Sequence, residues 1–427
     1  MTAGTMINAY APGAGNLSPQ DEARIARRSR LLGPAYRLFY ETPLHLVRGE
    51  GVWLYDAGGR AYLDCYNNVA SLGHCHPHVV AATARQSALY ASHTRYLHDT
   101  VLDYAERLLA TFPAGLSHVM FTCTGSEAND LALRIARAHT GGTGVIVTEN
   151  AYHGVTLATS SLSPSLGAGV PLGDHVRTIP APAEAARFAV DVQTAIADLT
   201  RHGIKPAALL VDTIFSSDGV YADPAGFLKP AAEAIRAAGG VFIADEVQPG
   251  FARTGDAMWG FQRHGLIPDM VSLGKPMGNG YPVAGLVMRP EIIAAFGASA
   301  RYFNTFGGNA VAAATALAVL EVIEGEGLLA NAATVGAHFR AGLIALAATN
   351  DSLGALRAAG LFLGQDIVTD GQPDAGKAAR VVNRMREDGV LISATGAQGH
   401  VLKIRPPLVF RPEHVDRVLE SLRSALV

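Results

Sequence analysis

Five short apolar runs constrain the fold of this 427-residue chain more than any other feature. Helical patterns lie between most of the runs, a spacing typical of strands that alternate with helices in one sheet. The runs are Val119–Cys123, Gly144–Thr148, Ala208–Val211, Val241–Ala244 and Met270–Leu273. Because they are apolar almost throughout, both faces of the sheet should be covered. The sequence therefore predicts an α/β fold with a mostly parallel central sheet.

Shorter patterns flank this region. Before it they predict a surface helix at Asp21–Leu32, a hairpin at Leu46–Asp56 and a strand at Ala61–Asp64. After it they predict two helices, at Ala310–Glu324 and about Leu328–Ala348. Short strands, at Leu361–Asp366, Val390–Ile392 and Val401–Ile404, and a final helix, about Pro412–Leu426, should complete a smaller α+β domain. We expect an arm and helix (1–30), a segment packing with the small domain (31–70), a large domain (71–309) and a small C-terminal domain (310–427).

Composition excludes several kinds of partner. The net charge is -3 and no basic block occurs, so nothing indicates nucleic acid. The longest run of mostly apolar residues, Ala310–Leu320, is too short and too rich in alanine to span a bilayer. The N-terminus lacks a basic stretch followed by an apolar segment, so we expect no signal peptide. The three cysteines form no CxxC pair. We therefore expect a cytoplasmic protein with free thiols.

Lys275 stands at the end of the fifth apolar run, between Gly274 and Pro276. A lysine at the end of a core strand is costly unless it is used or paired. One use is a Schiff base, since a desolvated amine loses its proton more readily and becomes a nucleophile toward an aldehyde. The alternative is a lysine whose ammonium reaches solvent from a loop.

Polar or aromatic side chains also stand after the ends of three other apolar runs. Gly125 and Ser126 stand where a strand turns into a helix, which suits a phosphate but also an ordinary serine cap. Tyr152 could stack on a flat ring or belong to the core. Asp245 needs a cationic partner if it is buried, and a protonated pyridine nitrogen would serve. Together with Lys275, these are the parts that pyridoxal 5'-phosphate requires.

His74, Cys75 and His76 invite a metal hypothesis. Their spacing does not match a usual zinc set and no fourth ligand is nearby. We therefore predict no metal, and expect His76 and Pro77 to begin a helix.

Residues from about 35 to 427 resemble the class III aminotransferases of the fold-type I pyridoxal-phosphate enzymes. The matching motifs are Gly125-Ser-Glu-Ala-Asn129, Tyr152-His-Gly154, Asp245-Glu-Val-Gln248, Gly274-Lys-Pro276 and Asn304-Thr-Phe-Gly-Gly-Asn309. The resemblance implies that Lys275 binds the cofactor covalently and that Asp245 pairs with the ring nitrogen. It implies cofactor contacts for Gly125, Ser126, Tyr152, His153 and Gln248. It further implies a homodimer, or a larger assembly such as a tetramer, in which Thr305 reaches the neighbouring subunit's cofactor phosphate.

Further motifs are similar to a subgroup, the ethanolamine-phosphate and phosphohydroxylysine phospho-lyases. They are Cys65-Tyr-Asn-Asn-Val-Ala-Ser-Leu-Gly-His-Cys-His-Pro77 and Arg95-Tyr-Leu-His-Asp99. In addition, the family usually carries Arg-x-x-Pro-Pro near the C-terminus to bind a substrate carboxylate, whereas this chain has Lys403 at that position. Lysine lacks the bidentate fork of arginine, which weakens the case for amino-acid exchange.

We therefore expect a lyase that eliminates phosphate from O-phosphoethanolamine, giving acetaldehyde, ammonia and phosphate. Its candidate substrate ligands are Arg37, which is the first candidate for the phosphate, and Asn68, Lys403 and Arg405. An ω-type aminotransferase that exchanges an amine with a 2-oxo acid is the alternative. A catalytically dead regulator of the same fold is a weaker one, because Lys275 and Asp245 are both present.

Overall fold

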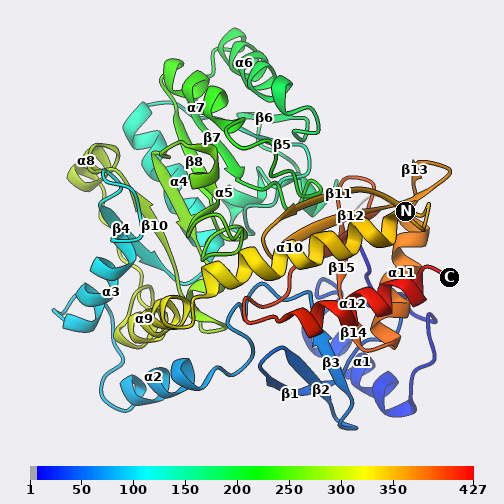
Figure 1. The fold of residues 1–427 in the computed structure, drawn as a ribbon. Helices are drawn as coiled ribbons and strands as arrows, with labels where there is room; N and C mark the ends of the chain where they lie inside the picture. The colour runs from blue at the N-terminus through cyan, green and yellow to red at the C-terminus, as the bar shows by residue number, and fades with distance from the viewer. Residues whose placement is uncertain (1–6) are drawn as a thin grey trace.

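A seven-stranded sheet forms the centre of the computed structural model, which describes residues 7–427 (Figure 1). Its strand order is β4-β10-β9-β8-β7-β5-β6. The strands are β4 (His118–Thr122), β5 (Gly144–Thr148), β6 (Val176–Ile179), β7 (Pro206–Asp212), β8 (Val241–Asp245), β9 (Met270–Leu273) and β10 (Ala284–Met288). β10 is antiparallel to β4 and β9, and the remaining pairs are parallel. The predicted mostly parallel α/β sheet is confirmed, and each of the five apolar runs overlaps with one of its strands.

Two strands of this sheet were not predicted. β6 is buried only at its two ends, Val176 and Ile179, and polar residues stand between them, so its sequence lacks a continuous apolar run. β10 follows the glycine-rich stretch after Lys275 and contains Gly285 itself. Pairing with β4 and β9 holds β10 in place, and local sequence propensity for a strand is weak there.

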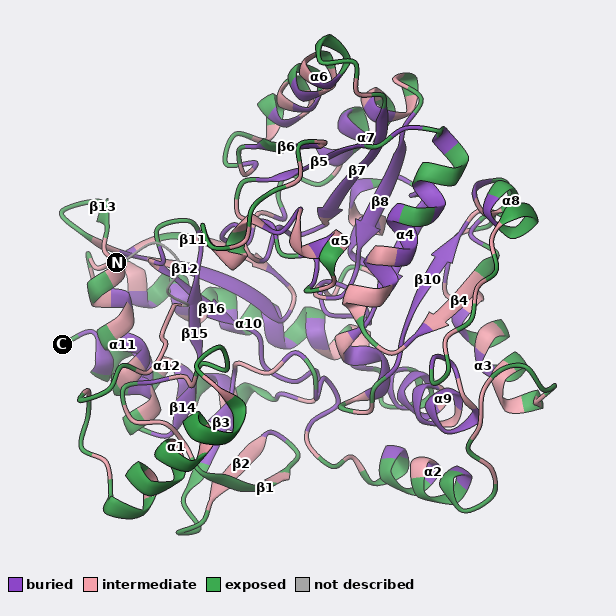
Figure 2. Cartoon of the chain, turned by 180° about the vertical axis from the view of Figure 1, so that it is seen from behind, coloured by how far each residue is buried: buried purple, intermediate pink, exposed green. Residues whose placement is uncertain are grey.

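Helices cover the central sheet, whose strands β5, β7, β8, β9 and β10 are buried along most of their length, whereas the edge strand β4 is mostly of intermediate exposure (Figure 2). The helices before residue 310 are α1 (Pro19–Leu32), α2 (Pro77–Ser87), α3 (Asp99–Leu109), α4 (Gly125–Thr140), α5 (Leu157–Ser160), α6 (Ala185–Arg201), α7 (Leu228–Ala237) and α8 (Pro290–Ser299). Short 3-10 helices lie at η1 (Pro164–Leu166), η2 (Gly260–His264) and η3 (Lys275–Gly278). No helix between residues 7 and 427 is long and apolar enough to cross a membrane.

Two smaller sheets complete the fold. One has the order β1-β2-β3-β14 and joins the N-terminal hairpin to the C-terminal part, since β14 pairs with β3 in parallel. The other has the order β11-β12-β16-β15, with β13 paired to β12. The strands are β1 (Leu46–Glu50), β2 (Trp53–Asp56), β3 (Ala61–Asp64), β11 (Leu353–Ala359), β12 (Phe362–Thr369), β13 (Gln372–Pro373), β14 (Val390–Leu391), β15 (Ser393–Thr395) and β16 (Val401–Ile404).

Four helices belong to the C-terminal third: α9 (Ala310–Gly325), α10 (Leu328–Ala347), α11 (Ala375–Glu387) and α12 (Pro412–Ala425). α9 packs on α2 and α3, whereas α10 packs on α12 and β11. The boundaries that we placed at residues 30, 70 and 309 stay predictions. Of the arm and helix expected over residues 1–30, positions 1–6 lie outside the described residues. Residues 8–10 bond to the backbone of residues 38–40.

Candidate active site

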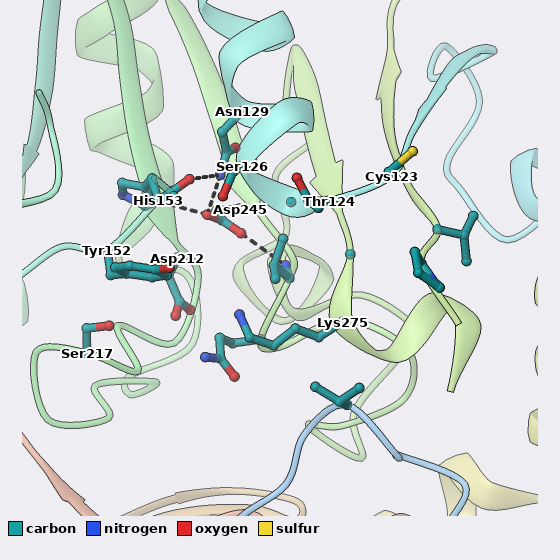
Figure 3. A pocket seen from close by; sticks show the side chains of 18 of the residues that line it. Cys123, Thr124, Ser126, Asn129, Tyr152, His153, Asp212, Ser217, Asp245 and Lys275 are labelled. Carbon is teal, nitrogen blue, oxygen red and sulfur yellow. Dashed lines mark hydrogen bonds and ion pairs between the residues drawn. The ribbon is translucent and has the colours of Figure 1, made fainter. Parts of the chain in front are cut away.

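A cavity of about 330 Å³ opens at the carboxyl ends of the parallel strands of the central sheet. This is the edge at which α/β sheets usually bind ligands. Seven predicted site residues line it: Gly125, Ser126, Tyr152, His153, Asp245, Gln248 and Lys275. Figure 3 shows most of these side chains around one hollow. The tertiary structure thus brings together residues that the sequence separates by up to 150 positions.

Asp245 ends β8 and is buried among hydrogen-bond donors. Its Oδ2 atom accepts from His153 Nδ1 at 2.7 Å and from Asn129 Nδ2 at 2.8 Å (Figure 3). Its Oδ1 atom accepts from the Val247 amide at 3.0 Å. Burial by itself raises the pKa of Asp245, but the bonds and charge from His153, together with those donors, bring the pKa below its usual value. The carboxylate therefore stays ionised and can hold a cation in the cavity.

Lys275 follows β9 directly and begins the short helix η3. Burial lowers the pKa of its ammonium, and the nearby charge of Arg405 acts in the same direction, while Asp245 and Asp212 oppose both. A lowered pKa makes the free amine more abundant near neutral pH. Lys275 is therefore suited to attack an aldehyde and to move a proton afterwards.

The N-terminus of α4 forms a cradle for an anion. Thr124 caps the helix by accepting from the Glu127 amide at 3.2 Å, so the serine cap that we considered for Ser126 is wrong. Among residues 7–427, the amides of Gly125 and Ser126 have no acceptor, and both residues line the cavity. Free amides at the positive end of a helix favour a phosphate.

Close packing explains two glycines beside this cradle. A Cβ atom on Gly125 would lie 2.9 Å from Val247 Cγ2. Gly154 has φ +135°, and its Cβ would lie 2.6 Å from Ser126 Oγ. Only glycine accepts both constraints at position 154.

Asp212 lines the cavity and was missed by the sequence analysis. It ends β7 in register with Asp245 on β8, and the amides of Ile214 and Ser216 donate to it at 3.0 and 3.1 Å. Burial raises the pKa of its carboxyl. Asp212 directly follows the predicted strand Ala208–Val211, as Asp245 follows Val241–Ala244, so the rule that led to Asp245 would have found Asp212 as well. Asn129 was quoted in a motif but not assigned a role, although it bonds to Asp245.

Three predicted substrate ligands are buried and are not among the residues that line the cavity. Asn68 Nδ2 donates to the Gln248 carbonyl at 2.9 Å and to Gln248 Oε1 at 3.1 Å. Arg405 Nη1 donates to the same Oε1 atom at 3.2 Å. Lys403 Nζ lies 5.7 Å from the ring centroid of Phe362. Burial lowers the pKa of Lys403 well below its usual value.

Arg37 and Thr305 are exposed and do not line the cavity. Phe39 packs edge-on against Tyr66 with the ring centroids 5.1 Å apart, which holds the Arg37 segment near Arg405. The roles of Arg37 and Thr305 stay predictions.

The histidines of the His-Cys-His motif have carboxylate partners. His74 Nε2 bonds to Asp64 at 2.8 Å and His76 Nε2 to Glu326 at 3.1 Å. Within residues 7–427, no group of three His, Cys, Asp or Glu side chains could hold a metal ion.

Comparison with known proteins identifies the family. Residues 39–426 match the family model Aminotransferase class-III. This chain belongs to the class III aminotransferase family. It therefore has the fold of the fold-type I pyridoxal-phosphate enzymes, as predicted, and its relatives depend on that cofactor.

Named relatives differ in activity. An alanine–glyoxylate aminotransferase 2-like protein of Drosophila melanogaster is 40% identical, with 94% of this chain and 86% of that protein covered. Ethanolamine-phosphate phospho-lyase homolog 1 of Caenorhabditis elegans is 35% identical, with 95% and 93% covered. The solved structure of a phospholyase from Arthrobacter in complex with phosphoethanolamine is 43% identical, with a TM-score of 0.92, and 94% of this chain and 99% of that chain are covered.

The residues of this family member fit pyridoxal 5'-phosphate. The free amides of Gly125 and Ser126 suit its phosphate, and the ionised Asp245 suits a protonated ring nitrogen. Lys275 supplies an amine of lowered pKa, and Tyr152 supplies an aromatic face in the same cavity. The cavity thus contains a partner for each reactive part of the cofactor.

Proposed function

We propose that this class III family member is a phospho-lyase that acts on O-phosphoethanolamine. Its products would be acetaldehyde, ammonia and inorganic phosphate, with one water consumed. The strongest support is the 43% identity, over 94% of this chain, to a phospholyase whose structure contains phosphoethanolamine. The 35% identical phospho-lyase homolog of Caenorhabditis elegans supports the same activity.

Each residue of the cavity has a role in this proposal. When bound, pyridoxal phosphate supplies the electron sink for breaking a bond next to the amine carbon. Lys275 holds the cofactor covalently and, once released, removes the proton from the amine carbon of the substrate. Asp245, supported by His153, keeps the ring nitrogen protonated. The amides of Gly125 and Ser126 bind the cofactor phosphate, Tyr152 stacks on the ring and Gln248 donates to the ring hydroxyl.

Lys403 is the leading ligand for the substrate phosphate. Among the described residues its ammonium makes no hydrogen bond, although Lys403 is buried. The burial that lowers its pKa would be offset by a phosphate, because a nearby anion favours the protonated amine. Arg37, the leading candidate from the sequence, is exposed and is the further candidate for this phosphate.

We also propose a homodimer in which Thr305 reaches the partner's cofactor phosphate. The Arg95 guanidinium lies 3.7 Å from the ring centroid of Phe303. This contact joins the exposed segment around Arg95 to the exposed segment around Phe303. On these segments Leu97 is 96% exposed and Phe306 is 69% exposed. Apolar side chains this exposed favour burial against another subunit. Light scattering of the purified protein measures its mass directly, and a monomer would refute the dimer.

The cytoplasm is the compartment that we propose. Cys65 is buried, Cys75 is exposed and Cys123 is partly buried, and all three are free thiols. Free thiols suit a reducing compartment.

An aminotransferase activity is the second candidate. It is favoured by the 40% identity to the alanine–glyoxylate aminotransferase 2-like protein of Drosophila melanogaster. Such an activity needs a 2-oxo acid to restore the cofactor, whereas the elimination does not. This difference separates the two candidates in one assay.

The test is phosphate release from O-phosphoethanolamine by the purified protein with cofactor and without a 2-oxo acid. Equal amounts of phosphate and acetaldehyde over many turnovers would support the lyase. If neither forms, but an amine and pyruvate give alanine, the aminotransferase is correct. Lys275→Ala should reduce either activity by at least about 10²-fold, because the variant lacks both the covalent anchor and the proton-transferring amine. Lys229→Ala, at an exposed position outside the cavity, is the control.

A further inference from the structure

We propose that Arg405 and Asn68 are positioning residues for Gln248 and do not bind the substrate. This inference rests on the proposed contact between Gln248 and the ring hydroxyl of the cofactor, and it holds whether the enzyme is a lyase or an aminotransferase.

The orientation of the Gln248 side-chain amide follows from its neighbours. A guanidinium can only donate hydrogen bonds, so the Gln248 atom 3.2 Å from Arg405 Nη1 must be the oxygen. A backbone carbonyl can only accept, so the Asn68 atom 2.9 Å from the Gln248 carbonyl must be the nitrogen. That nitrogen also donates to Gln248 Oε1 at 3.1 Å. Two donors therefore fix the oxygen of Gln248, and the amide nitrogen is left for the cavity that Gln248 lines.

Amide orientation matters because the ring hydroxyl of pyridoxal phosphate is electron-rich. An N–H group that faces it donates a hydrogen bond and stabilises negative charge on that oxygen. A flipped amide would present its carbonyl oxygen instead, and two acceptors repel each other. Arg405 and Asn68 exclude the flipped state by occupying Oε1.

Tyr66 holds the guanidinium of Arg405 in place. Arg405 Nε donates to the Tyr66 carbonyl, and the guanidinium carbon lies 4.7 Å from the centroid of the Tyr66 ring. The Arg405 amide also donates to the Cys65 carbonyl at 2.8 Å. These contacts anchor both the backbone and the side chain of Arg405 to the turn after β3.

Asp64 fixes that turn in its own right. Its Oδ1 atom accepts from the amides of Tyr66 and Asn67, both at 3.0 Å, and its Oδ2 atom bonds to His74 Nε2 at 2.8 Å. Asp64 is 1% exposed, so solvent does not compete for these bonds. A rigid path therefore runs from Asp64 through Tyr66 and Arg405 to Gln248.

Lys403 and Arg405 thus have different tasks although only Ile404 separates them. Arg405 bonds to Tyr66 and Gln248, whereas the Lys403 ammonium makes no hydrogen bond within residues 7–427. We therefore assign the substrate anion to Lys403, whereas Arg405 acts on the cofactor site by orienting Gln248.

The experiment measures cofactor binding, apart from turnover. Apo-protein is titrated with pyridoxal phosphate, and the visible absorbance of the bound cofactor is then followed against pH. Arg405→Met and Asn68→Leu should each weaken cofactor binding about tenfold, which is the change in affinity expected when one hydrogen bond to a charged group is lost. Each should also shift the pKa of the visible band. The KM for O-phosphoethanolamine should change by less than about threefold, since a positioning residue contributes little to substrate binding.

Controls separate positioning from substrate binding. Arg405→Lys keeps the charge without the planar fork, so it should not restore the absorbance of the wild type. In a Gln248→Leu background, Arg405→Met should have no additional effect on cofactor affinity. Arg340→Met, at an exposed position outside the cavity, should match the wild type. If Arg405→Met does not fold, Asn68→Leu tests the same contact.

A different set of results would overturn the proposal. These are an unchanged titration and absorbance in Arg405→Met together with a large rise in KM that Arg405→Lys restores. Absence of phosphate release in the wild type would refute the lyase. The cofactor titrations of the Arg405, Asn68 and Gln248 variants would still test the positioning of Gln248, because they do not depend on turnover.

Discussion

His153 Nδ1 lies 2.7 Å from Asp245 Oδ2, and both side chains are buried at the edge of the cavity that Lys275 enters. Asn129 Nδ2 donates to the same carboxylate oxygen at 2.8 Å. A carboxylate that accepts hydrogen bonds in a dry site keeps its charge, and its charge is what a protonated ring nitrogen requires. The hydrogen bonds of Asp245 therefore belong to the chemistry of the site.

Replacement of His153 tests this relationship. His153→Phe removes the donor to Asp245 and should weaken cofactor binding about tenfold, because a hydrogen bond to a charged group is lost. His153→Asn retains an N–H group close to the position of Nδ1 and should recover part of the affinity. Titration of each apo-protein with pyridoxal phosphate provides the measurement. Equal affinity in His153→Phe and the wild type would show that His153 does not support Asp245.

Replacement of Lys403 tests the substrate site. Lys403→Met should raise the KM for O-phosphoethanolamine by roughly 10- to 100-fold, the effect of losing a charge-assisted bond to phosphate. The cofactor absorbance should not change. Lys229→Met is the control, because Lys229 is exposed and does not line the cavity. An unchanged KM in Lys403→Met would assign the phosphate to another cation, such as Arg37.

Replacement of Gly154 tests the anion cradle. Gly154→Ala would place a methyl group 2.6 Å from Ser126 Oγ at a backbone φ of +135°, so Ser126 and the start of α4 must shift. We expect at least about tenfold weaker cofactor binding, because the α4 amides lose their alignment with the phosphate. Gly169→Ala is a matched control, since its Cβ would meet nothing within 4 Å. Identical cofactor affinities in the two variants would contradict the cradle.

Asp218 should make stability depend on pH. It is buried, it accepts from Thr148 Oγ1 at 2.8 Å, and burial raises its pKa to about 7 from an ordinary value of 3.8. Between these two values the folded protein binds a proton that the unfolded chain has released. The contribution of Asp218 to the free energy of unfolding therefore falls as the pH rises through this window.

Asp218→Asn removes this contribution, because an amide does not titrate. Relative to the wild type, the variant should gain roughly 1–4 kcal/mol between about pH 4 and pH 8. Denaturant unfolding at both pH values, at a fixed cofactor concentration, measures the gain. Glu246 has a pKa raised to about 7 by burial as well, so part of the pH dependence should remain in the variant. A constant difference between variant and wild type would exclude a proton on Asp218.

Strands whose side chains are buried on both faces could be predicted from the sequence. β5 and β9 have the predicted bounds, because each is a short, mostly apolar run followed by a polar residue or glycine. β11 was not predicted. Its positions are buried, partly buried and exposed in no regular order, and its pairing with β12 includes a register shift. Where pairing partners decide the structure, local sequence gives a weak signal.

The sequence by itself determined which chemical groups stand at the ends of the strands. Lys275, Asp245, Gly125 and Tyr152 could be named because each follows an apolar strand, and parallel strands end at one edge of a sheet. Only the tertiary structure decided which polar groups remain available for ligands. Arg405 and Asn68 meet at Gln248 from distant parts of the chain and hydrogen-bond there, whereas the Lys403 ammonium makes no hydrogen bond within residues 7–427. The physical reason is that a donor's availability depends on acceptors brought close by folding, and spacing along the chain does not specify them.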